Sequence, residues 1–179
     1  MRRLTIISAA LAGLIGLATG SALADPSPAI VAAVAATTNQ PSYHLTITSP
    51  RAGTTEADMV KPDKMHVIMK DGESIVIGST MYMKMGGKWT KMSAAGMWSD
   101  PTAAVKLLQT HHADYTSVDL GMRTAGGVPY HAYSVTDTKK HTTETVYIDG
   151  AGRLGRVEAR GTVIVFSKYG ETVSIQAPM

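Results

Sequence analysis

Apolar and polar residues alternate along most of the chain beyond residue 40, which predicts a long series of β-strands. The alternation is cleanest over residues 43–48. Similar runs follow over residues 55–61, 64–70, 74–77, 81–85, 88–92, 115–123, 129–136, 144–148, 156–166 and 171–177. Turn pairs such as Asp71-Gly72 and Gly86-Gly87 separate consecutive runs at hairpin spacing. The pattern therefore predicts about eleven antiparallel strands.

Two segments have helical spacing instead. Residues 28–37 begin with Pro28 and place Ile30, Val31 and Val34 at helical intervals. Residues 101–109 follow Ser99 and Asp100, either of which can cap the helix, and carry a partial apolar face. We expect both helices to pack on the sheet. The periodicity fits a sandwich, a closed barrel and one strongly curved sheet equally well.

The first 24 residues have the features of a secretory signal peptide. Arg2 and Arg3 precede an apolar stretch over residues 4–17, and Ala22-Leu23-Ala24 forms the cleavage sequence. We therefore expect one domain over residues 25–179, located in the periplasm or secreted. Those residues carry 15 Lys+Arg against 14 Asp+Glu and no cysteine, so neither a nucleic-acid partner nor thiol chemistry is expected.

Methionine is unusually frequent among the apolar residues. The chain has 11 Met and a single Phe. Methionine is flexible and unbranched, and proteins use it where an apolar surface must accept variable partners. This composition points to a cavity for an apolar ligand of imprecise shape.

The ordered set of runs also resembles a known family. Residues 60–66 (VKPDKMH) and 75–91 resemble the LolA-like periplasmic lipoprotein-carrier superfamily, and residues 126–133, 146–149, 154–158 and 166–170 resemble its mycobacterial LppX and LprG branch. The resemblance implies a mainly β (α+β) fold: a curved antiparallel sheet forming an unclosed half-barrel, with helices covering its apolar concave face. It also implies a carrier of lipids or lipoprotein acyl chains that has no cofactor and no catalytic activity.

On that fold, the alternation assigns the strand residues that line the lipid-binding cavity, and residues of the two predicted helices close it. They are Ile30, Val34, Leu45, Ile47, Met59, Met65, Val67, Met69, Ile77, Met81, Met83, Met85 and Leu107, with Ala57 and Ile75 on the same predicted face. Lys61, Trp89 and Trp98 are candidate gate residues, although the lipoprotein-localisation chaperones have Arg where this chain has Lys61. We expect a monomer that receives a lipid or an acylated protein from an inner-membrane donor.

Two other functions fit parts of the pattern. Met81, Met83 and Met85 are soft thioether ligands suited to Cu(I), and His66, His111, His112, His131 and His141 offer imidazoles. Strand residues two apart lie about 7 Å from each other, which opposes a shared metal and favours cavity lining. A lipid-sensing regulatory module is the second alternative. No hydrolase elbow, zinc-protease motif or phosphate loop is present in the sequence, so we expect no enzyme.

Overall fold

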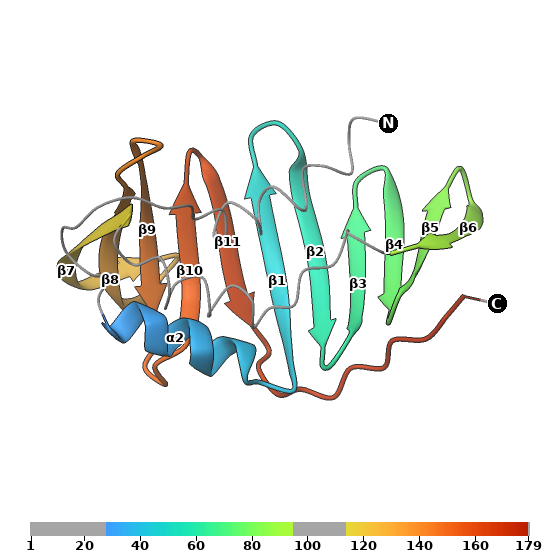
Figure 1. Ribbon diagram of the computed structural model, residues 1–179, viewed down its shortest axis with the longest axis horizontal. Coiled ribbons are helices and arrows are strands. Elements are labelled where there is room, and N and C mark those ends of the chain that lie inside the picture. The colour runs from blue at the N-terminus through green and yellow to red at the C-terminus, as the bar shows by residue number, and fades with distance from the viewer. Residues whose placement is uncertain (1–27, 95–113, 179) are drawn as a thin grey trace. The chain divides into compact units, whose positions relative to one another are not determined.

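The computed structural model describes residues 28–94 and 114–178, which form one helix and eleven strands (Figure 1). The elements are α2 (Pro28–Thr38), β1 (Ser42–Ser49), β2 (Gly53–Val60), β3 (Lys64–Met69), β4 (Gly72–Ile77), β5 (Thr80–Met85), β6 (Lys88–Ser93), β7 (Tyr115–Ala125), β8 (Val128–Asp137), β9 (Thr142–Ile148), β10 (Leu154–Ala159) and β11 (Thr162–Ser167). Their order in the sheet is β6-β5-β4-β3-β2-β1-β11-β10-β9-β8-β7. The sheet is antiparallel and not closed, which confirms the mainly β half-barrel fold.

The predicted elements agree with the observed ones except near the C-terminus. Residues 156–166 form parts of two strands, β10 and β11. Arg160 and Gly161 turn the chain between them, with φ angles of 48° and 79° in the left-handed region. Residues 171–177 form no strand, so that prediction was wrong. The signal peptide and the helix over 101–109 lie outside the described residues. No helix in the described part is long and apolar enough to cross a membrane.

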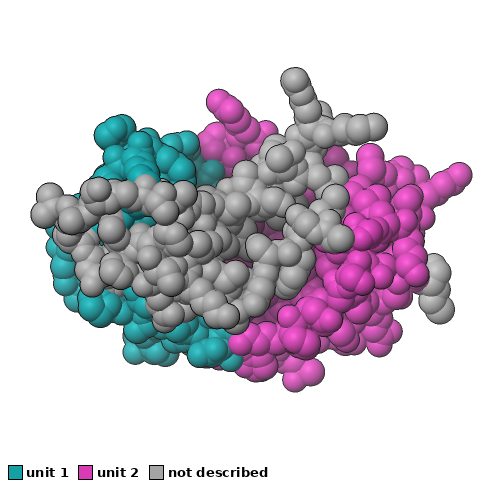
Figure 2. Space-filling view, in the orientation of Figure 1, with its two compact units in different colours: residues 1–39, 100–163 teal, residues 40–99, 164–179 magenta. Residues whose placement is uncertain are grey.

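The chain divides into two compact units, which Figure 2 distinguishes by colour. Unit 1 comprises residues 1–39 and 100–163, and unit 2 comprises residues 40–99 and 164–179. The single domain over residues 25–179 stays a prediction.

In unit 1, helix α2 packs against β9 and β10 (Figure 1). Ile30 and Val34 are buried on the helix, as is Val157 on β10. Thr37, also buried, accepts a hydrogen bond at Oγ1 from the Leu154 backbone N–H at 2.9 Å. This bond joins the last turn of the helix to the first residue of β10.

In unit 2, the C-terminal segment after β11 passes the ends of β1, β2 and β3 (Figure 1). Ser42 accepts a hydrogen bond at its carbonyl from the Gly170 N–H, and its hydroxyl donates to the Glu171 carbonyl. Farther along, Lys64 Nζ donates to the carbonyl of the buried residue Ile175. The alternation over 171–177 misled because this segment pairs with strand ends rather than with a neighbouring strand.

Candidate functional site

A row of methionine side chains crosses unit 2 on one face of the sheet. Met59 lies opposite Met65, and Met81 lies opposite Met92. Val76 joins the two pairs, because it lies opposite Met65 on one side and Met81 on the other. Residues directly opposite in adjacent strands share a face of the sheet. We call Met59, Met65, Val76, Met81 and Met92 the methionine row.

A second row on the same face lies beside the methionine row. It contains Leu45, Ala57, Val67, Ser74 and Met83, which are successive cross-strand partners. All five residues are buried, and Leu45 and Val67 are 1% and 0% exposed. The two rows together form an apolar surface, which we call the methionine face. Val76, Met81, Met83 and Ala94 form a buried cluster there, and Met65 and Met92 pack against it while remaining partly exposed.

The structure corrects the predicted face of β4. Ile77 lies opposite Lys64 and Thr80, and Ile75 lies opposite His66 and Tyr82, so both isoleucines are on the reverse face. Three consecutive apolar residues, Ile75, Val76 and Ile77, leave the alternation ambiguous, and the register places Val76 on the methionine face. The prediction that Ile75 and Ile77 share a face with Met81 and Met83 was therefore wrong.

The other candidate residues are distributed as follows. Ile47 is buried on β1 and Met69 is partly buried on β3, whereas Met85 is 66% exposed at the end of β5. Ile30 and Val34 are buried in unit 1. Leu107 and Trp98 lie outside the described residues.

Neither described gate residue borders the buried cluster. Trp89 lies opposite Lys84 on the reverse face, with the Lys84 Nζ atom 5.4 Å from the centre of its ring. Lys61 is exposed at the turn between β2 and β3. The β5–β6 register places Trp89 on the face opposite to the methionine face. A gating role stays a prediction for both Trp89 and Lys61.

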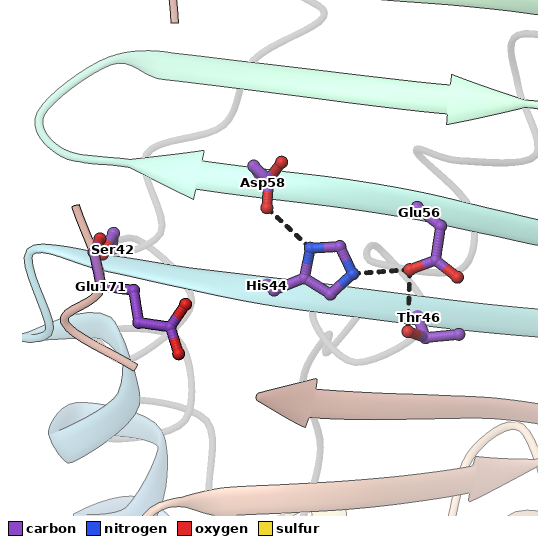
Figure 3. Close-up of polar contacts among 6 residues, drawn as sticks. All are labelled: Ser42, His44, Thr46, Glu56, Asp58 and Glu171. Atoms are coloured by element: carbon purple, nitrogen blue, oxygen red, sulfur yellow. Dashed lines mark hydrogen bonds and ion pairs between the residues drawn. The ribbon is translucent and has the colours of Figure 1, made fainter. Parts of the chain in front are cut away.

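The reverse face of unit 2 carries a polar network that sequence reasoning missed (Figure 3). His44 places Nδ1 2.6 Å from Asp58 Oδ1 and Nε2 2.6 Å from Glu56 Oε2. The Thr46 hydroxyl donates to the same Glu56 oxygen at 2.8 Å. Ionised carboxylates only accept hydrogen bonds, so His44 makes both bonds when both ring nitrogens carry protons. These partners are 12 and 14 residues away from His44 in sequence, and only the β1–β2 register brings them together.

The network continues on β3 to β5 with a second histidine. His66 Nε2 lies 2.8 Å from Glu73 Oε1, and Lys84 Nζ lies 3.4 Å from Glu73 Oε2. His66 is thus on the face opposite to Met81 and Met83 and cannot join them around one metal ion. Among the described residues, no group of histidine and carboxylate side chains has the arrangement of a metal site.

The remaining histidines add no ligand to that face. In unit 1, His131 stacks on Tyr133 and lies 2.7 Å from Asp119, and His141 is exposed. His111 and His112 lie outside the described residues. The described histidines therefore do not support the mixed methionine and histidine copper site.

Glu73 provides a test of the polar network. The hydrogen bond from His66, followed by the contacts with Lys84, lowers the pKa of Glu73 below its ordinary value of 4.5, although partial burial opposes the shift. A lowered carboxyl pKa stabilises the fold above the ordinary pKa, and this stability is lost as pH falls through the folded-state pKa. We expect Glu73→Gln to lower the free energy of unfolding at pH 7 by about 0.2–1 kcal/mol. Urea denaturation should show that the difference persists down to about pH 4.5 and disappears below it; an equal loss at pH 3 would contradict this explanation.

Comparisons with known proteins identify the fold. Neither protein-family models nor curated protein sequences give a match. Among solved structures, LprF from Mycobacterium bovis matches with a TM-score of 0.61 and 19% identity, over 86% of this chain and 99% of that one. The Mycobacterium tuberculosis lipoprotein LppX matches with a TM-score of 0.59 and 18% identity, over 84% of this chain and all of that one. The chain therefore has the fold of LprF and LppX.

Proposed function

We propose that this protein is a non-enzymatic carrier that binds an acyl chain of a lipid or acylated protein on its methionine face. The observation that carries the proposal is the pair of adjacent cross-strand rows, which gathers Met59, Met65, Met81, Met83 and Met92 on one apolar surface. The fold shared with LprF and LppX supports it.

The physical properties of methionine suit a carrier. Removing a chain of about sixteen carbons from water is worth roughly 12 kcal/mol, at about 0.8 kcal/mol per CH₂, before the ordering costs of binding are subtracted. Leucine or isoleucine would form a rigid surface complementary to one shape, whereas the thioether chain can change rotamer to fit different chains. A surface of this kind can bind and release varied acyl chains.

The binding test uses polar substitutions at the two partly exposed members of the methionine row. We expect Met65→Gln and Met92→Gln each to weaken binding of a fluorescent fatty acid about tenfold, because an unpaired amide on an apolar surface costs about 1–3 kcal/mol. Met122→Gln is the matched control, since Met122 is 65% exposed on β7 in unit 1. Wild-type protein that binds no acyl chain, or substitutions in the row that bind as well as the control, would refute the proposal.

The N-terminal sequence supports export. We propose that residues 1–24 are removed and that the protein acts as a monomer in the periplasm or outside the cell, receiving its ligand from an inner-membrane donor. Sequencing the N-terminus of protein recovered from the native compartment is expected to begin at Asp25. Recovery of uncleaved protein in the cytoplasm would contradict this part of the proposal.

A further inference from the structure

We propose that Met81, Met83 and Met92 also form a binding site for a soft monovalent metal ion, Cu(I) or Ag(I), at the β5–β6 end of the methionine face. The inference goes beyond acyl-chain binding, because it depends on the thioether sulfur atoms and not on the apolar surface that they provide.

The cross-strand register lets the three side chains converge. Met81 and Met92 are directly opposite each other in β5 and β6, so their Cβ atoms are about 4.5–5.5 Å apart. Met83 follows on the same face of β5 and is the diagonal neighbour of Met92, at about 7–8 Å, which is within reach of long side chains. Each sulfur lies two bonds beyond its Cβ atom, so three sulfurs can reach one ion.

The surroundings of the three residues favour a soft ion over a hard one. Val76 and Ala94 complete the buried cluster and contribute no polar side chain, so the thioethers are the ligands available within the described cluster. Thioethers select Cu(I), whereas Mg²⁺ and Ca²⁺ prefer oxygen ligands. Met65 packs against the same cluster and can supply a fourth sulfur.

The position of Met92 gives an ion access to the site. Strand β6 is the last strand at this end of the sheet, and Met92 remains partly exposed there. Partial exposure also reduces the cost of placing a positive charge beside apolar groups. Met85, which the sequence pattern offered as the third ligand, is 66% exposed and is not part of the cluster. The structure thus replaces Met85 with Met92.

Leucine substitutions test whether the sulfur atoms bind the ion. Leucine keeps the apolar bulk of methionine at little cost in stability but has no sulfur. We expect wild-type protein to bind one Ag(I), used as a redox-inert probe, with micromolar or tighter affinity in native mass spectrometry and calorimetry, and one Cu(I) under anaerobic reducing conditions. Met81→Leu, Met83→Leu and Met92→Leu should each weaken Ag(I) binding at least tenfold, and the triple variant should lose it. The same variants should keep a wild-type circular dichroism spectrum, so that a loss of Ag(I) binding cannot be attributed to unfolding.

Two further variants serve as controls. Met85→Leu and Met122→Leu remove exposed thioethers, on the same strand and in unit 1 respectively, and should leave Ag(I) affinity within twofold of wild type. Failure of wild-type protein to bind Ag(I) at micromolar concentration would overturn the proposal, as would a folded triple variant that still binds it or an equal loss in Met85→Leu. None of these outcomes bears on acyl-chain binding, which the glutamine variants test separately.

Discussion

Replacing Gly155 with alanine is expected to lower the free energy of unfolding by about 3 kcal/mol, which is at the upper end of the usual cost of overpacking. A Cβ atom at position 155 would lie 2.8 Å from Tyr130 Cδ1 and closer still to Cε1. The Tyr130 ring is buried and lies edge-on to Tyr147, with ring centres 5.8 Å apart. Because that ring is held by its neighbours, either it or the backbone of β10 must move to admit the methyl group.

Urea denaturation of the matched variants separates this clash from a general effect of replacing glycine. Gly150→Ala is the control, since a Cβ at position 150 would meet no atom within 4 Å and its φ angle is not positive. We expect the control to change stability by less than about 0.5 kcal/mol. Adding Tyr130→Ala to Gly155→Ala should cost less than the two single changes together, because the ring that clashes is then absent. Equal stability of the two alanine variants would contradict the close approach.

The sequence alone predicts the strands because most of them have one buried and one exposed face. In β1, Leu45 and Ile47 are buried while His44 and Thr46 are partly exposed, so period-2 alternation is plain in the residues themselves. The same pattern holds in β5 for Met81 and Met83. This alternation depends only on which side chains along one strand are apolar and which are polar, and a single sequence gives that information.

The register between strands depends on turn geometry and is much harder to read from one sequence. The run Ile75-Val76-Ile77 is apolar on both faces, so the pairing of Val76 with Met65 and Met81 decides which side chain joins the methionine row. The pairing of Met81 with Met92, on which the proposed ion site rests, is likewise a matter of register. Local pattern therefore predicts the candidate residues, and the observed pairing selects among them.

Replacing Leu45 with alanine is expected to destabilise the fold by about 3 kcal/mol, within the range of about 2–5 kcal/mol seen for large-to-small changes in protein cores. Leu45 is 1% exposed and lies opposite Ala57, which is too small to fill the space left by the missing methyl groups. Ile68→Ala is the control: Ile68 is 49% exposed on β3, and the change should cost less than about 1 kcal/mol. Thermal and urea unfolding measure both variants. Equal costs would mean that the face containing Leu45 does not form the core of unit 2.

The same experiment, extended to Met83→Ala, measures how far the methionine face can adapt. Met83 is 7% exposed and belongs to a buried cluster with Met81, against which Met65 and Met92 pack. The cost of a cavity depends on how completely the neighbours close over it, and flexible thioether chains close more readily than branched ones. We therefore expect Met83→Ala to cost about 1–2 kcal/mol less than Leu45→Ala, although both side chains are almost fully buried. A larger loss for Met83→Ala would indicate a rigid surface fitted to one shape, which is the opposite of what a carrier of varied acyl chains requires.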